Sequence, residues 1–261
     1  MACAGGKLAL TNDDTYLERY SISTEDTLVS RAYAEGFWRR SYALAESYYF
    51  QGLNAVDTQD RIPIVLPKFD FNYVSAPVWR GGRVSLDANA QLLTRTGGTD
   101  TGRVSLETGW RQGFNGLLNG DRFTFSAMLS LDGYNVNDGE VPPQGVAEDG
   151  TFMRAFPQLA LEWSYPFLRR GASSRVLLEP VAQLVLAPRG GNSVKIPNEV
   201  SVNFEFDDTN LWSPRRFPGR DRVQSGSRVD YGLRAAWYGD SGAQAGAFLG
   251  QSYRLQQDNS F

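Results

Sequence analysis

Residues 83–92 alternate strictly between polar and apolar side chains, and this pattern constrains the fold more than any other feature of the chain. Successive side chains of a β-strand point to opposite faces, so the segment has one apolar face and one fully polar face. The apolar set is Val84, Leu86, Ala88, Ala90 and Leu92, and the polar set is Arg83, Ser85, Asp87, Asn89 and Gln91. Strands of about ten residues with this alternation are typical of a transmembrane β-barrel with a water-filled lumen.

The same alternation recurs along the chain between turn-rich connections. Short turns alternate with long polar connections, and one of these, residues 135–152, is predicted to be extracellular. No segment sustains the apolar spacing of an amphipathic helix. We therefore predict an all-β fold, an antiparallel up-and-down transmembrane β-barrel of which about a dozen strands are present. The expected strands are 15–23, 28–36, 41–51, 62–74, 83–96, 102–112, 121–134, 153–165, 174–187, 228–238 and 243–255, with an irregular loop at about 188–224.

Two residue types refine the strand prediction. Pro157 and Pro180 lie inside expected strands, and because proline lacks a ladder donor, each should mark a bulge or a weakly paired place. Aromatic residues such as Trp38, Trp110 and Trp237 gather near strand ends, where the interfacial girdles of a barrel would place them. Aromatic residues also favour strands in general, so the second signal has an alternative explanation.

The composition excludes most catalytic chemistry. The chain has no histidine and a single cysteine, Cys3, which removes the commonest general base, the commonest metal ligand and any internal disulfide. The densest acidic group, Glu199, Glu205, Asp207 and Asp208, lacks the spacing of a calcium loop. No P-loop, Rossmann or nucleophile-elbow motif occurs. We therefore expect no enzymatic activity, no metal and no cofactor, and the near balance of 26 basic and 29 acidic residues argues against nucleic acid.

The start of the chain lacks the features of an exported protein. Residues 1–10 have neither the basic start nor the apolar core of a signal peptide, and no apolar run approaches the roughly 18 residues of a membrane helix. A barrel protein must first cross the inner membrane. We therefore expect this chain to be a fragment, a mature segment or a mis-started reading frame.

Several short sequence segments, found in order along the chain, resemble the LptD family of outer-membrane proteins for lipopolysaccharide (LPS) assembly, also called organic solvent tolerance proteins. The segments are residues 13–20, 34–37, 48–53, 178–183, 196–199, 204–211, 216–222 and 230–234. The resemblance divides the chain into an unmatched head, residues 1–10, and a partial barrel domain, residues 11–261. The family-like residues of the irregular loop are Pro197, Asn198, Glu199, Asp207, Asp208, Asn210, Arg216, Phe217, Pro218, Gly219, Asp221 and Arg222.

The resemblance implies transport without covalent chemistry, in the Gram-negative outer membrane. The family receives LPS from a periplasmic protein bridge through an N-terminal jelly-roll domain, and releases it into the outer leaflet through a large barrel plugged by a lipoprotein, LptE. On the alternation, the arginines that face the lumen and would meet the anionic head group are Arg83, Arg103, Arg111 and Arg122. The alternative is that they pair inside the barrel with Glu107, Asp87 and Asp132.

The chain departs from the family pattern at both ends. The jelly-roll domain, the signal peptide, the first strands, part of the C-terminal barrel and the paired cysteines of the family have no counterpart. About a dozen strands of a barrel expected to have about twenty-six would leave two open edges. We therefore expect a truncated barrel segment.

Two other functions remain open on sequence alone. A stand-alone outer-membrane porin of about twelve strands would pair its first and last strands and conduct ions alone. A soluble β-sandwich binding protein would instead pack the apolar faces, including Val84, Leu86, Phe123 and Phe125, against a second sheet.

Overall fold

The computed structural model describes residues 1–13, 15–54, 57–137, 149–199, 201 and 210–256. Its strands are β1 (Ala2–Lys7), β2 (Thr27–Trp38), β3 (Ser41–Gly52), β4 (Ile64–Val74), β5 (Arg83–Thr94), β6 (Asp100–Asn115), β7 (Arg122–Asn137), β8 (Gly150–Ser164), β9 (Phe167–Arg170), β10 (Ser174–Leu186), β11 (Arg228–Gly239) and β12 (Gln244–Arg254). The helical elements are α1 (Tyr16–Arg19) and the single 3₁₀ turns η1 (Gln59–Arg61) and η2 (Trp79–Gly81). No helix among the described residues is long and apolar enough to cross a membrane.

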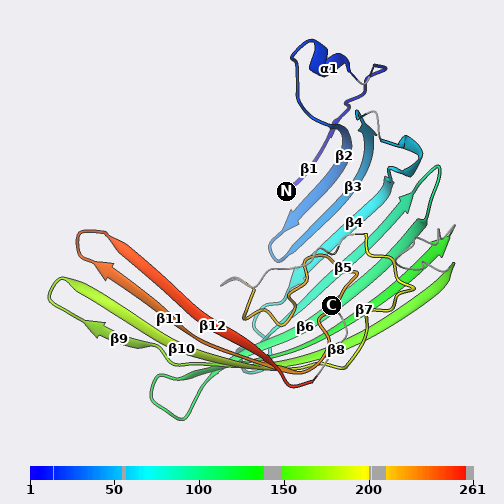
Figure 1. The fold of residues 1–261 in the computed structure, drawn as a ribbon. Helices are drawn as coiled ribbons and strands as arrows, with labels where there is room; N and C mark the ends of the chain where they lie inside the picture. Colours follow the sequence, from blue (N-terminus) through cyan, green and yellow to red (C-terminus); the bar gives the residue numbers. More distant parts are fainter. Residues whose placement is uncertain (14, 55–56, 138–148, 200, 202–209, 257–261) are drawn as a thin grey trace.

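All twelve strands belong to one antiparallel sheet in which chain neighbours pair (Figure 1). The order is β1 to β8 followed by β10, β11 and β12, and β9 pairs with β10 off this path. This confirms the predicted all-β, up-and-down architecture. Among the described residues β1 and β12 form the two edges and do not pair with each other, so the sheet is an open barrel wall.

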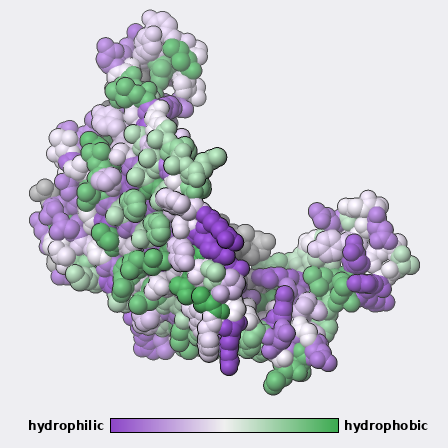
Figure 2. Space-filling model, turned by 180° about the vertical axis from the view of Figure 1, so that it is seen from behind, coloured by the Kyte–Doolittle hydropathy of each residue, from purple (hydrophilic) through white to green (hydrophobic). Residues whose placement is uncertain are grey.

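The sheet curves around a concave polar face and exposes an apolar convex face. The register keeps the alternation in phase across strands, because Gln91 lies opposite Arg103 and Leu92 lies opposite Gly102. Figure 2 shows hydrophobic side chains gathered over the strands on the side turned away from the viewer of Figure 1. Large exposed apolar residues of the convex face include Leu92, Val104, Leu131, Leu159, Leu184 and Leu249.

The connections alternate between two ends of the sheet. One end, called here the short-turn end, carries residues 39–40, 75–82, 116–121, 165–173 and 240–243. The other, called the long-connection end, is the end at which β1, β3, β5, β7 and β10 finish. Aromatic side chains of the convex face meet near the short-turn end, where the Trp110 ring lies 6.0 Å from Trp79 and 5.7 Å from Phe125. This arrangement matches an interfacial girdle.

The structure corrects the predicted strands in three places. Residues 15–23 do not form a strand, because Tyr16–Arg19 form the short helix α1. The strands β1 and β9 were not expected, since neither Ala2–Lys7 nor Phe167–Arg170 alternates between polar and apolar residues.

The two prolines lie where the ladder between β8 and β10 is interrupted. The two strands pair only over Leu159–Ser164 of β8 and Val181–Leu186 of β10. Pro180 immediately precedes this overlap, and Pro157 lies beyond its other end. Each proline therefore lacks its backbone N–H at a position where β8 and β10 are no longer paired.

Candidate functional site

The connection between β10 and β11 lies on the concave face of the sheet, in yellow to orange in Figure 1. We call residues 187–227 the docked loop; residues 187–199, 201 and 210–227 of it are described. Gly191 permits the close approach of the loop to the wall, with φ of +100°. A Cβ atom at this position would lie 3.0 Å from Val223 and 3.1 Å from the Phe156 ring, so glycine fits here and a larger residue does not.

Asp221 is the centre of the contacts that hold this loop. Its Oδ1 accepts a hydrogen bond from Arg103 Nη1 of β6 at 2.5 Å, and its Oδ2 accepts one from the Glu199 backbone N–H at 2.9 Å. Arg103 also donates to Asn89 and Gln91 of β5. The Asp221 and Arg103 side chains are only 3% and 8% exposed. A buried ion pair with additional hydrogen bonds fixes the position of the loop on the wall.

Arg154 of β8 is the second anchor. Its guanidinium binds Asp132 of β7 at 2.7 Å and donates to the backbone carbonyl oxygens of Gly191, Arg220 and Asp221. The planar group has donors in several directions, so one arginine joins two strands to two parts of the loop.

A third anchor lies on β11, where Asp230 is shared by two buried arginines. Arg216 Nη2 of the loop lies 2.6 Å from Asp230 Oδ1, and Arg228 Nε lies 3.1 Å from Oδ2. Ser252 Oγ of β12 donates to the same carboxylate at 2.6 Å. Burial lowers the pKa of the Arg216 guanidinium, and the Asp230 charge opposes that effect. The paired carboxylate therefore keeps a dehydrated arginine charged at the base of the loop.

Weaker contacts complete the docking. Arg95 Nη2, at the end of β5, lies 2.8 Å from Glu199 Oε2, and Arg215 pairs with Glu107 of β6. Burial also lowers the pKa of Arg220. Apolar packing contributes at the other side of the loop, where Trp212 is buried against Val181 and Leu211. The loop therefore covers the concave face near the long-connection end by both ionic and apolar contacts.

The register places all four sequence-predicted arginines on the concave face, in different environments. Arg103 is the buried member of the Asp221 pair, whereas Arg83 and Arg111 are exposed. Arg122 is exposed and lies 3.6 Å from Glu179.

None of the three alternative carboxylate partners forms a described ion pair with these four arginines. Glu107 pairs with Arg215, Asp132 pairs with Arg154, and Asp87 accepts a hydrogen bond from Asn72.

A model of the family LPS transport system D, LptD, matches residues 4–261 of the chain. The chain belongs to the LptD family. This confirms the resemblance found in the sequence, and it places the chain in an outer-membrane family that transports LPS without covalent chemistry. A search of curated proteins gave no match.

In this LptD family member the family-like residues Glu199, Arg216 and Asp221 bind the wall, and others make contacts within the docked loop. Asn198 exchanges two hydrogen bonds with Ser201 at 2.8 and 3.0 Å, and Ser201 Oγ accepts from the backbone N–H groups of Asp221 and Arg222. The Asn210 carbonyl accepts from the Ser213 N–H. The remaining described members are Pro197, which is half-buried; Phe217, which is buried; Pro218, which is exposed; and Gly219, whose φ is +83°. Asp207 and Asp208 lie outside the described residues.

The sequence analysis missed Arg154, Arg228 and Asp230 of this LptD site. One signal for Arg154 was available, because it occupies a polar-face position directly opposite Asp132. Arg228 and Asp230 share a face of β11 in the same way, next to the loop. The local sequence does not indicate which loop atoms these residues bind. Arg154, for example, contacts loop residues that lie 66 and 67 positions away in the chain.

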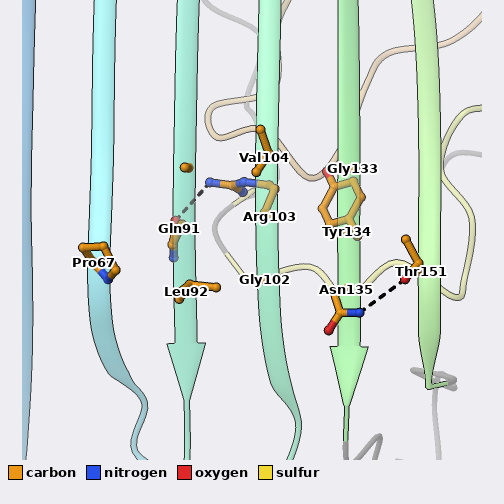
Figure 3. A pocket seen from close by; sticks show the side chains of 11 residues that line it. Pro67, Gln91, Leu92, Gly102, Arg103, Val104, Gly133, Tyr134, Asn135 and Thr151 are labelled. Atoms are coloured by element: carbon orange, nitrogen blue, oxygen red, sulfur yellow. Dashed lines mark hydrogen bonds between the residues drawn. The ribbon is translucent and has the colours of Figure 1, made fainter.

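The convex side of the wall has an apolar depression of about 440 Å³ (Figure 3). Leu92, Val104 and two glycines, Gly102 and Gly133, line it. At one side of it, Asn135 donates to Thr151 Oγ1 at 3.3 Å. The depression is bordered as well by Gln91, Arg103 and Tyr134, whose positions in the register belong to the concave face, so Arg103 lies between the depression and the docked loop.

Proposed function

We propose that this chain is part of the wall of an outer-membrane translocon that inserts LPS into the outer leaflet without any covalent step. The observation that carries the proposal is the division of one continuous sheet into a polar concave face and an apolar convex face. LPS has a phosphorylated sugar head and several acyl chains. A wall with these two faces gives the head group a hydrated path while the acyl chains stay with lipid.

The lengths of the connections support an orientation for this wall. Outer-membrane barrels have short periplasmic turns and longer extracellular loops. The short-turn end would therefore face the periplasm, and the docked loop would cover the lumen from the extracellular side. In this orientation the Trp110 girdle lies at the level of the inner-leaflet head groups.

The proposed partners follow the family. LPS is the transported molecule, an LptE-like lipoprotein would plug the lumen, and the periplasmic Lpt bridge would deliver LPS through a jelly-roll domain outside this chain. The protein would be an integral component of the Gram-negative outer membrane and would contact its lipids along the convex face. We propose no role for nucleic acid.

Two structural observations favour this function over the alternatives. A stand-alone porin would close by pairing its first and last strands, and β1 and β12 do not pair within the described part of the chain. A soluble sandwich would cover its apolar face with a second sheet, yet all described strands belong to one sheet, and Val104 and Leu92 are 63% and 52% exposed.

Site-specific photo-cross-linking in living Gram-negative cells tests the proposal. A photoreactive phenylalanine analogue would be placed in the full-length protein at Met128, on the concave face of β7, or at Phe125, on the convex face of the same strand near the girdle. We expect an LPS adduct at Met128 that disappears when LPS synthesis is stopped, and none at Phe125. Equal adducts at both positions, or none at Met128, would contradict passage along the concave face.

A further inference from the structure

The docked loop divides the concave face into a covered half and an open half. Near the long-connection end the inward side chains are buried beneath the loop, including Asn89, Gln91, Arg103, Asp132 and Arg154. Towards the short-turn end the same strands carry half-buried or exposed inward residues, such as Ser85, Arg83 and Arg111. The covered half is filled by the chain itself, whereas the open half is available to a ligand.

Two arginines face each other in the open half. Arg83 of β5 lies directly opposite Arg111 of β6 in the antiparallel register, which places their Cβ atoms about 5 Å apart. Like charges in this position repel each other. Among the described residues neither side chain has an ion pair or a hydrogen bond. The cross-strand pair therefore consists of two exposed arginines on the concave face with no described anionic partner.

The carboxylates of β5 and β6 on this face are already engaged, and the next one, Glu162 of β8, is two strands away from Arg111. Asp87 and Glu107 lie opposite each other four residues further along the strands, which is about 13 Å away. Asp87 accepts a hydrogen bond from Asn72, and Glu107 pairs with Arg215 of the docked loop.

Neutral hydrogen-bonding groups surround the arginine pair. Ser126 of β7 continues the row on the far side of Arg111, and Ser85 lies one position further along the face of β5. Gly109 lies opposite Ser85, and a Cβ there would lie 2.6 Å from Ser85 Oγ, so the glycine keeps the floor of this region open.

The geometry points to a binding site for a phosphate group of an amphiphile, formed by Arg83 and Arg111 with Ser85 and Ser126 as hydroxyl partners. Guanidinium groups bind phosphate oxygens bidentately, and a dianion between two opposed arginines relieves their repulsion. Arg83 and Arg111 lie at the depth of Trp110, whose ring belongs to the girdle at head-group level. This inference rests on the proposed function. In that function these residues make the first lumenal contact with the LPS phosphates, at the periplasmic end.

Binding measurements on the full-length protein in its complex, in detergent, test the site. The probes are labelled LPS and the same LPS after phosphatase treatment. We expect the native protein to prefer the phosphorylated probe and the double variant R83Q/R111Q to lose that preference, with at least about tenfold weaker binding, because each charge-assisted contact contributes more than a neutral one. Inorganic phosphate should compete with the probe only in the native protein.

A second pair of opposed arginines provides the matched control. Arg170 of β9 lies opposite Arg175 of β10, and both are exposed. R170Q/R175Q removes the same charge in the same geometry, away from the central strands, and should keep the native preference. An equal loss in both double variants would show a general charge effect and overturn the site, as would unchanged binding in R83Q/R111Q.

A third measurement separates this site from the transport proposal. If R83Q/R111Q binds both probes like the native protein but the LPS adduct at Met128 persists, the phosphate site is wrong and the lumenal path stands. If the adduct is also absent from the native protein, the transport proposal fails as well. Heat-dependent mobility on denaturing gels verifies that each variant remains folded.

Discussion

Substitution of Asp221 by asparagine should release the docked loop without unfolding the wall. The change preserves the shape of the side chain and one acceptor oxygen, but it leaves the Arg103 guanidinium without a counter-charge. Both side chains are almost fully buried, at 3% and 8% exposure. The variant therefore removes one partner of a desolvated ion pair at the centre of the loop contacts.

The size of the effect depends on the hydrogen bonds that Arg103 retains in the variant. Breaking a buried ion pair from one side costs about 3–5 kcal/mol. Arg103 retains acceptors at 2.9 Å on Asn89 and 3.0 Å on Gln91, so the lower end applies. We expect the free energy of loop opening to fall by about 3 kcal/mol, which corresponds to an open population about 150-fold larger.

Trypsin sensitivity of the folded full-length protein measures this population. The docked loop contains cleavable residues from Arg189 to Arg222, and cleavage of a rapidly opening segment follows the equilibrium population of the open form. D221N should be cleaved in this loop about a hundredfold faster than the native protein. The control is D240N, which removes the same charge from the exposed turn between β11 and β12.

A double-mutant cycle decides whether the ion pair is the cause. If Arg103 and Asp221 act together, R103Q/D221N should be much less sensitive than the sum of the two single variants, with a coupling of at least about 1.5 kcal/mol. Simple additivity, or a D221N rate equal to that of D240N, would refute the reasoning.

Three further tests, two of them with a matched control substitution, address other parts of the structure. D230N removes the carboxylate that two buried arginines share, and should also raise tryptic cleavage of the docked loop, at a cost of about 3 kcal/mol; unchanged cleavage would contradict the shared anchor. Gly232→Ala would collide with a backbone carbonyl of β12 and should lower the urea midpoint, whereas Gly133→Ala meets nothing within 4 Å and should be neutral or stabilising; equal midpoints would argue against the register. Leu106→Arg on the convex face should reduce folding into bilayers by about 2–4 kcal/mol, and Met128→Arg on the concave face by far less; the reverse order would exchange the lipid and water faces.

The local parts of this fold could be predicted because a two-residue period determines which side chains share a face. The polar set from Arg83 to Gln91 and the position of Arg103 follow directly from the alternation. The same reasoning failed for α1, whose four residues carry an apolar spacing too short to distinguish a turn of helix from a strand. It also failed for β1, where Gly5 and Gly6 give no alternation.

The candidate site could be predicted only in part, because its pairs are distant in sequence. Local reasoning offered Arg103 the carboxylates of neighbouring strands, yet its partner Asp221 lies 118 residues away on the irregular loop. A strand period reports the face of a side chain and says nothing about which loop covers that face. The family resemblance identified the loop residues, and the three-dimensional arrangement was needed to show what they hold.

The short overlap between β8 and β10 makes a weak joint in the middle of the wall. Six residue pairs join the two strands, whereas β7 and β8 share fifteen. Beside this joint the docked loop is tied to β8 through Arg154 and to β11 through Arg228, whose Nη2 donates to the carbonyl oxygens of Ser213 and Pro214. The loop therefore links the two sides of the joint. A force that separates β1–β8 from β10–β12 must first break the loop contacts.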